Sequence, residues 1–197
     1  MGFLRILRHL LRQKDPFFRE EQLPANMFRS YDLPHGEVRW CITGDYAETA
    51  KNHCAAVCLT NLALCFTQMG ILPSLPVDKI FTAVHQLIGN GPIFFLQKKA
   101  KRCFSNTNQF LIGKKLCSFS EVKDSLEQGR PCALLLANHL LDWHWVLVLG
   151  YREYSAEECY LRMADGWHPT ADRYYRLLPG AEWLSAIQFT FTPNKDA

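Results

Sequence analysis

The sequence predicts one α+β domain in which helices come first and antiparallel strands follow. The chain has 197 residues, of which 48% are hydrophobic and 21% charged, as is typical of a single globular domain. Helical periodicity dominates the chain up to residue 131, where short runs with strand character take over. Neither an internal repeat nor a low-complexity tract breaks this order.

Composition and charge exclude several classes of protein. A net charge of +3 is too small to indicate a nucleic-acid-binding protein. No uninterrupted apolar run approaches the roughly 18 residues that span a bilayer. The eight cysteines lack the close spacing of a small secreted scaffold, so we interpret them as mostly reduced. Bases interrupt every apolar run near the N-terminus, unlike in a signal peptide, and we therefore expect a cytoplasmic location.

The N-terminus carries the pattern of a short basic amphipathic helix over residues 3–13. Its apolar face consists of Phe3, Leu4, Leu7, Leu10 and Leu11, and its basic face of Arg5, Arg8 and Arg12. Such a helix either packs on the domain or makes peripheral contact with a membrane surface. Prolines then punctuate an irregular lead-in up to Trp40. We divide the chain into residues 1–40, this helix and lead-in, and residues 41–197, the folded domain.

Three helices are predicted ahead of the strands. Residues 54–66 are apolar almost all round and favour a central, buried helix. Residues 77–88 form a second helix, which ends at a Gly-Asn-Gly-Pro break. Ser118 and Glu121 have the spacing of a capping box and open a third helix that stops at Gly129.

A basic stretch separates the second and third of these helices. Residues 80–120 contain no Asp or Glu, and they hold Lys98, Lys99, Lys101, Arg102, Lys114 and Lys115. We interpret this stretch as a solvated basic face.

Short runs rich in Val, Leu, Tyr and Phe, each bounded by turn residues, follow the third helix. They cover residues 131–137, 144–151, 159–163, 173–178 and 186–192. The architecture expected from these elements is a central buried helix packed on an antiparallel β-sheet.

Three residues at the ends of predicted elements have the types that a thiol hydrolase needs. Cys54 opens the buried helix, where the positive end of the helix dipole favours a thiolate. His144 begins an apolar strand, and Asp165 follows the next strand on a turn. This order fits a nucleophile, a general base and a residue that orients the base. Cysteines deeper in the helix, such as Cys58 and Cys65, are expected to be core residues.

Four segments carry a resemblance to a known family. They are Asn52-His53-Cys54-Ala55-Ala56, residues 120–131 leading into a strand, residues 144–151 (HWVLVLGY) and Ala164-Asp165-Gly166-Trp167. As a set they resemble the papain-like cysteine peptidases, and within them the compact bacterial branch related to bacteriocin leader-processing peptidases. The resemblance covers about residues 45–192. It implies the papain-like cysteine proteinase fold, with Cys54 as nucleophile, His144 as general base and Asp165 as orienting residue.

Two departures from the family concern the oxyanion hole. The family usually places Gly after the nucleophile and Gln about six residues before it, whereas this chain has Ala55 and Glu48. An ionised Glu would repel a developing oxyanion. Either the side-chain amide of Asn52 acts alongside the backbone N–H of Cys54, or the oxyanion hole is impaired.

Other constellations give weaker alternatives. Cys54 and Cys58 stand four residues apart and could share a metal with His53, but no second ligand pair follows, so we predict neither metal nor cofactor. His139 is the alternative base, although it falls between a strand and a turn and His144 is therefore favoured.

The aromatic side chains around the expected site allow two interpretations. Trp143, Trp145 and Trp167 flank it, and they are either core aromatics or the walls of an apolar substrate cleft.

The leading hypothesis is a cysteine peptidase or amidase that acts on a peptide or acyl substrate through a thioester on Cys54. A second hypothesis keeps this nucleophile and transfers the acyl group to an amine. A third, suggested by Glu48 and Ala55, is a catalytically impaired domain that binds peptides or proteins. Residues 1–35 could in addition cover the cleft as an inhibitory segment.

Overall fold

The computed structural model describes residues 17–34, 36, 38–91, 93, 95–105, 109–139, 142–177, 183 and 185–193. Within these residues one eight-stranded antiparallel sheet is combined with four α-helices, which confirms the α+β prediction. The helix predicted over residues 3–13 lies outside the described residues.

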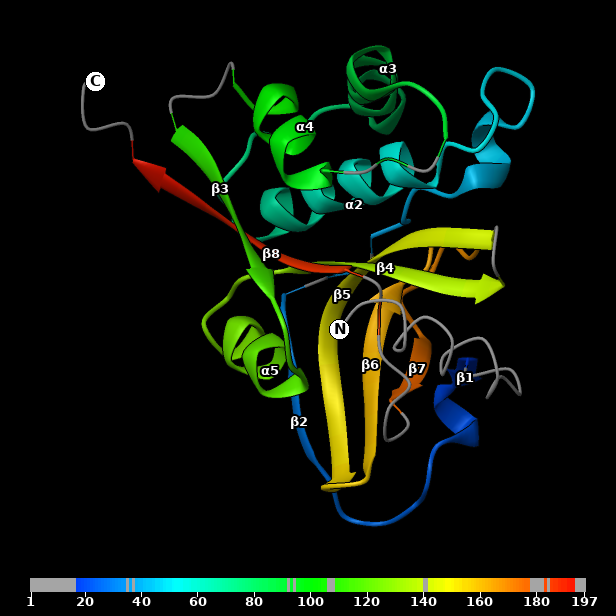
Figure 1. Ribbon diagram of the computed structural model, residues 1–197, viewed down its shortest axis with the longest axis vertical. Helices are drawn as coiled ribbons and strands as arrows, with labels where there is room; N and C mark the ends of the chain where they lie inside the picture. The colour runs from blue at the N-terminus through cyan, green and yellow to red at the C-terminus, as the bar shows by residue number, and fades with distance from the viewer. Residues whose placement is uncertain are drawn as a thin grey trace.

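The strand order is β1-β7-β6-β5-β4-β8-β3, with β2 paired to β5. The strands are β1 (Phe17–Arg19), β2 (Arg29–Asp32), β3 (Gln109–Leu116), β4 (Cys132–His139), β5 (Asp142–Ser155), β6 (Glu158–Ala164), β7 (Arg173–Leu177) and β8 (Ser185–Pro193). The helices are α2 (Cys54–Gln68), α3 (Val77–Ile88), α4 (Leu96–Cys103) and α5 (Phe119–Glu127), with 3₁₀ turns η1 (Glu20–Gln22) and η2 (Thr43–Tyr46). In Figure 1, α2, α3 and α4 lie above the β3–β8–β4 part of the sheet, and α5 lies below it.

Helix α2 is the central buried helix that the sequence predicts. Residues 55–66 are all buried, because small and branched apolar side chains leave no polar face. The buried amide of Asn61 fixes the segment that leads to α2: its Oδ1 accepts from the Cys41 N–H at 2.8 Å, and its Nδ2 donates to the Cys41 carbonyl at 3.0 Å. A residue in the middle of α2 therefore fixes the main chain at Cys41, in the segment that precedes the helix.

The other predicted helices begin and end close to the expected residues. Helix α3 covers residues 77–88. Helix α5 starts after Ser118, whose Oγ accepts from the Glu121 N–H at 3.2 Å, as in the expected capping box. It ends before Gly129, whose φ of 72° lies in the left-handed region that favours glycine.

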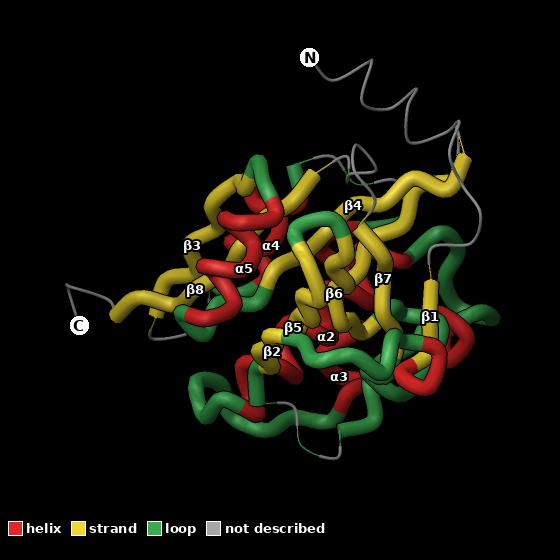
Figure 2. Tube along the Cα trace, turned by 90° about the horizontal axis from the view of Figure 1, so that it is seen from below, coloured by secondary structure: helices red, strands yellow, loops and turns green. Residues whose placement is uncertain are grey.

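Strand β5 is long enough to serve two parts of the sheet. Its first half pairs with β4, its second half pairs with β6, and β2 lies against the same edge as β4 further along. Gly150 permits the approach of β2, because a Cβ there would lie 2.6 Å from the Tyr31 carbonyl oxygen. Figure 2 shows β5, β6 and β7 side by side. The first residues of β5 thus extend past the point where β6 ends, and α2 contacts β5.

Four elements were not predicted from the sequence. The lead-in contains β1 and β2, which join the same sheet as the rest of the domain although they are only three and four residues long. The stretch interpreted as a solvated basic face contains α4 and β3. Helix α4 buries only Leu96 and Ala100, and β3 is an edge strand with Gly113 in its middle, so neither has a strong periodic signal.

Candidate active site

Cys54 is the first residue of α2, as the sequence predicts, and it is partly buried. Its Sγ lies 3.9 Å from the carbonyl oxygen of Trp143, at the start of β5. The N-terminus of a 15-residue helix places the positive end of the helix dipole at this thiol. The location of Cys54 therefore favours its ionised form.

His144 is next along β5 and is only 5% exposed. Its Nε2 lies 2.5 Å from the carbonyl oxygen of Asp165. One ring face stacks on Trp167, with centroids 3.9 Å apart and an angle of 10° between the planes. The hydrogen bond and the stack together fix both the direction and the tilt of the imidazole.

The carboxylate of Asp165 is buried and organises the turn that follows β6. Its Oδ1 accepts from the N–H groups of Trp167 and His168, each at 2.9 Å. Its Oδ2 lies 2.7 Å from Nδ1 of His168. The sequence predicted that this carboxylate would orient His144, whereas the contact described in the structure is made by the Asp165 main chain. Asp165 thus shapes a turn that presents its own carbonyl to the imidazole.

Gly166 brings the three elements together. Its φ is 76°, and a Cβ there would lie 3.2 Å from Val57 Cγ1 and 3.7 Å from His144 Nε2. Val57 belongs to the first turn of α2, so this turn and the His144 ring border the same glycine. The structure therefore gathers the N-terminus of α2, the start of β5 and the end of β6 at one place.

No protein-family model and no curated protein sequence matches the chain. The solved structures that are similar to it include the following two. A protein from Bacillus anthracis assigned as a C39-like peptidase has a TM-score of 0.51 at 14% identity, and the match covers 83% of this chain and 100% of that one. UfSP from C. elegans has a TM-score of 0.52 at 12% identity, and the match covers 93% of this chain. This chain spans 39% of the length of UfSP.

The chain has the fold of the papain-like cysteine peptidases. This confirms the fold that the resemblance implied, while the roles of individual residues stay predictions. Cys54 and His144 occupy the helix start and the strand start at which the resemblance placed a nucleophile and its base.

Asn52 lies two residues before Cys54 in the papain-like fold. Its φ of 50° is in the left-handed region, and its carbonyl oxygen accepts from the Gly91 N–H at 2.9 Å. Its side chain and that of Glu48 are both exposed. The oxyanion role of the Asn52 amide stays a prediction.

Two histidines near Cys54 and His144 make contacts that the sequence did not predict. His168 follows Asp165 by three residues, a spacing typical of a turn and the signal that could have indicated their contact. His53 is buried, and its Nε2 lies 3.0 Å from the Thr43 carbonyl oxygen. Because Thr43 N–H donates to the Gly166 carbonyl at 2.8 Å, this contact links the start of α2 to the turn after β6. The side chain of His139 lies outside the described part of the structure.

None of the eight cysteines, all of which lie within the described residues, forms a disulfide. Burial raises the pKa of the Cys103 and Cys159 thiols to about 11, and that of the Cys65 and Cys132 thiols to about 12. These thiols are neutral at physiological pH. Cys117 differs because it is exposed, and it provides an internal reference for the reactivity of Cys54.

No group of three or more His, Cys, Asp or Glu residues in the described ranges is arranged to hold a metal ion. Among the helices that the structure describes, none is both long and apolar enough to cross a bilayer.

Proposed function

We propose that the protein is a thiol hydrolase that cleaves peptide or other amide bonds through a thioester on Cys54. The observation that supports this proposal is that Cys54, at the N-terminus of α2, has its Sγ 3.9 Å from the carbonyl oxygen of Trp143, the residue before His144. The Asp165 carbonyl and Trp167 fix the His144 ring. A cysteine placed so that its thiolate is favoured, next to an imidazole of fixed orientation, is the minimum arrangement for thiol catalysis.

The contact with Asp165 assigns the proton on the imidazole. A carbonyl oxygen only accepts hydrogen bonds, so His144 Nε2 must be the donor. In the neutral ring Nδ1 then carries the lone pair. Nδ1 is accordingly the atom that accepts the thiol proton of Cys54 and later returns it to the leaving amine.

The reaction proceeds in two halves. The Cys54 sulfur attacks the acyl carbon, the carbon–nitrogen bond breaks, and the amine leaves with the proton held by His144. Water then gives a proton to His144 and attacks the thioester, releasing the acid and restoring the thiol. Both steps place negative charge on the acyl oxygen, where the Cys54 backbone N–H and the Asn52 amide are the proposed donors.

The test compares the protein with Cys54→Ala on a panel of amide and ester substrates. Hydrolysis by the native protein that disappears in Cys54→Ala supports the proposal, and activity that survives the substitution contradicts it. The same assay with added amines separates hydrolysis from acyl transfer, because a transferase forms the new amide in proportion to amine concentration.

A second candidate is a catalytically impaired domain that binds peptides or proteins. The exposure of Asn52, together with Ala55 and Glu48 at the positions where the family has Gly and Gln, favours it. Under this proposal Cys54 would react with small alkylating agents no faster than the exposed Cys117.

The fold reduces the range of residues that could act as an inhibitory segment, which the sequence placed at residues 1–35. Residues 17–34 include β1 and β2, which pair with β7 and β5, so they are integral to the sheet. Phe17 contacts the edge of Trp167, with ring centroids 5.7 Å apart. We restrict the proposal to residues 1–16, which lie outside the described residues and precede Phe17. Their deletion is expected to raise activity, and unchanged or lower activity counts against inhibition.

A further inference from the structure

Strand β3 leaves one of its two edges unpaired within the described residues. It ends the strand order beyond β8, and it has eight residues, whereas β1 at the other end has three. Outside the pairing with β8, residues 110–116 make no main-chain hydrogen bond to the described residues, and the Gly113 carbonyl accepts from the side chain of Gln97. Unpaired N–H and carbonyl groups along a strand are a template on which another extended segment can pair.

Apolar side chains are exposed along this edge. Phe110 and Ile112 are 56% and 41% exposed, and they alternate with the buried Leu111 and Gly113. Because side chains of a strand alternate between its faces, Phe110 and Ile112 lie on one face of β3, and the exposed Lys114 follows on the same face. Exposed apolar side chains beside unpaired main-chain groups are the features of a surface that another chain covers.

A cavity of about 310 Å³ opens beside the other face of β3. Its inner walls are apolar and buried, and they include Leu96, Leu135, Trp145 and Ile187. Phe95 and Lys115 also line it, and both are exposed. The opening therefore lies between the N-terminus of α4 and β3, where one side chain of a segment paired with β3 could enter.

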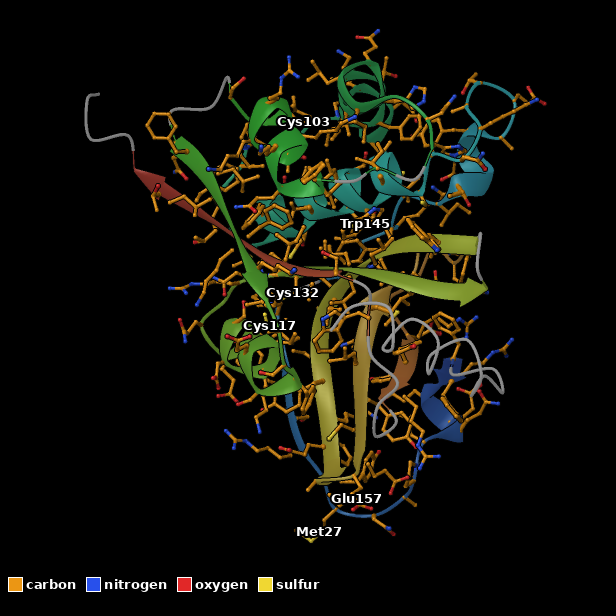
Figure 3. The ribbon with its side chains drawn as sticks, viewed as in Figure 1. Met27, Cys103, Cys117, Cys132, Trp145 and Glu157 are labelled. Atoms are coloured by element: carbon orange, nitrogen blue, oxygen red, sulfur yellow. The ribbon has the colours of Figure 1, made fainter. Side chains whose placement is uncertain are left out.

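The cavity is separate from the proposed catalytic residues. In Figure 3, Trp145 lies between α2 and the β4–β5 pair. His144 is its neighbour on β5, and adjacent side chains of a strand point to opposite faces, so the imidazole lies away from the cavity. A ligand at this cavity is consequently distinct from a substrate at Cys54.

The chain around the β3 edge is positively charged. Residues 80–120 contain no Asp or Glu, and their six bases all belong to α4 or β3, which contact each other. These bases are Lys98, Lys99, Lys101, Arg102, Lys114 and Lys115. The next carboxylate along the chain, that of Glu121, accepts from the Cys117 N–H at 2.5 Å. The edge therefore attracts an acidic segment.

The same charge disfavours two other occupants. Pairing of β3 with β3 of a second copy would bring two basic edges together, and lysines on an edge strand oppose such association. Residues 1–16 of the chain are also basic, with Arg5, Arg8, Arg12 and Lys14 against Asp15. An acidic segment of a different protein is thus the occupant that the charge favours.

We propose that β3 binds an extended acidic segment of another protein as an added strand, and that an apolar side chain of this segment enters the cavity. Main-chain pairing supplies affinity, and the cavity supplies a preference for an apolar side chain. Lys114 and Lys115 point to opposite faces of β3, so carboxylates on either face of the added strand meet an ammonium group. This surface is independent of the proposed thiol chemistry.

The experiment measures the fluorescence anisotropy of labelled eight-residue peptides as the protein is added. Three peptides alternate Val with Glu, Val with Lys, and Thr with Glu. The Val–Glu peptide should bind most tightly, because the Thr–Glu peptide lacks apolar side chains for the cavity and the Val–Lys peptide is repelled. Absence of binding by the Val–Glu peptide, or equal binding of all three peptides, would overturn the inference.

Lys115→Glu and Lys79→Glu are matched variants that test whether the charge acts locally. Both change the net charge equally, but Lys115 lies at the cavity opening, whereas Lys79 is exposed on α3. Lys115→Glu should weaken binding of the Val–Glu peptide about five-fold, the size of one exposed charge contact. Lys79→Glu should leave it nearly unchanged. Equal effects of the two variants would contradict binding at β3.

Amide hydrogen exchange separates strand pairing from charge attraction alone. N–H groups on the unpaired edge of β3 should exchange more slowly when the Val–Glu peptide is added, while exchange in α5 stays the same. Binding without slower exchange over residues 110–116 would contradict an added strand. Slower exchange on raising the protein concentration without peptide would assign the edge to a second copy and overturn the proposal. None of these measurements depends on Cys54, so a failure of the proposed thiol chemistry is distinguished from a failure of this inference.

Discussion

His144 Nε2 lies 2.5 Å from the carbonyl oxygen of Asp165, so the contact that orients the proposed base is made by the main chain. The Asp165 carboxylate acts one step further away, by holding the turn that carries this carbonyl. The Asp165 side chain can consequently be changed without removing the carbonyl that contacts His144.

Asp165→Asn should retain most of the reactivity of Cys54. Asn Oδ1 can still accept from the N–H groups of Trp167 and His168, so the turn and its carbonyl stay in place. Asn lacks the second carboxylate oxygen, which faces Nδ1 of the half-exposed His168, and this loss should lower the free energy of unfolding by about 1 kcal/mol. Asp165→Ala, which removes both acceptors, should reduce both alkylation and stability further. If Asp165→Asn and Asp165→Ala are equally stable and lower the alkylation rate of Cys54 equally, the carboxylate acts directly on His144, which would contradict this account.

Trp167→Ala should lower the alkylation rate of Cys54. The indole fixes the tilt of the His144 ring through a parallel stack, an interaction of about 1 kcal/mol beyond area burial, which corresponds to about five-fold in rate. Trp167→Phe keeps an aromatic face and should restore most of the rate. Failure of Phe to do better than Ala would show that the stack does not position the imidazole.

Gly166→Ala should impair both stability and reactivity. Its φ of 76° disfavours a side chain, and the new Cβ would press on Val57 and approach His144. Gly70→Ala is the matched control, because Gly70 has a φ of 72° and open space where its Cβ would be. Both variants should lose about 1 kcal/mol by denaturant titration. Alkylation of Cys54 should fall only in Gly166→Ala, and an equal fall in both would contradict the account.

Asn52→Gly tests the proposed oxyanion donor. Glycine keeps the left-handed backbone at φ 50° and removes the amide, so any effect belongs to the side chain. Loss of an oxyanion donor typically reduces acyl transfer by about 100-fold. Alkylation by iodoacetamide forms no oxyanion and should be unchanged. Substrate hydrolysis that continues at the native rate would assign the oxyanion hole to other donors.

Asn61→Leu should destabilise the fold by about 2–4 kcal/mol. The substitution leaves the buried N–H and carbonyl of Cys41 without their partner on α2, and each unpaired group costs about 1–2 kcal/mol. Thr67→Ala removes a side-chain bond within the same helix, to the Ala63 carbonyl, and should cost much less. Urea titrations of both variants measure the difference, and similar midpoints would show that the Asn61 contact contributes little.

The periodic elements could be predicted from the sequence, because each carries its own pattern. Helices α2 and α3 and strands β4 to β8 follow runs in which burial repeats along the chain. Strands β1 and β2 have three and four residues and depend on partners far along the chain, so no local pattern indicates them. Helix α4 buries only two residues, and most of its other residues are basic, so its sequence has little helical periodicity.

The site could be predicted in part for a similar reason. Cys54 and His144 stand at the beginnings of patterned elements, where a reactive side chain differs visibly from its apolar neighbours. The contact of the Asp165 carbonyl with His144 has no such signature, since every residue has a carbonyl. The pairing of β5 with β4, of β4 with β8 and of β8 with β3 depends on a register that the sequence alone did not specify.

The measurement that tests the central claim most directly is the rate at which iodoacetamide alkylates each cysteine from pH 4 to 9, in the native protein and in His144→Ala. An unperturbed thiol has a pKa of about 8.5 and reacts slowly below it. We expect Cys54 to react well below that pH, faster than the more exposed Cys117, and to lose this reactivity in His144→Ala. If Cys54 reacts no faster than Cys117 at any pH, or if His144→Ala folds normally and changes nothing, the proposed pair does not exist.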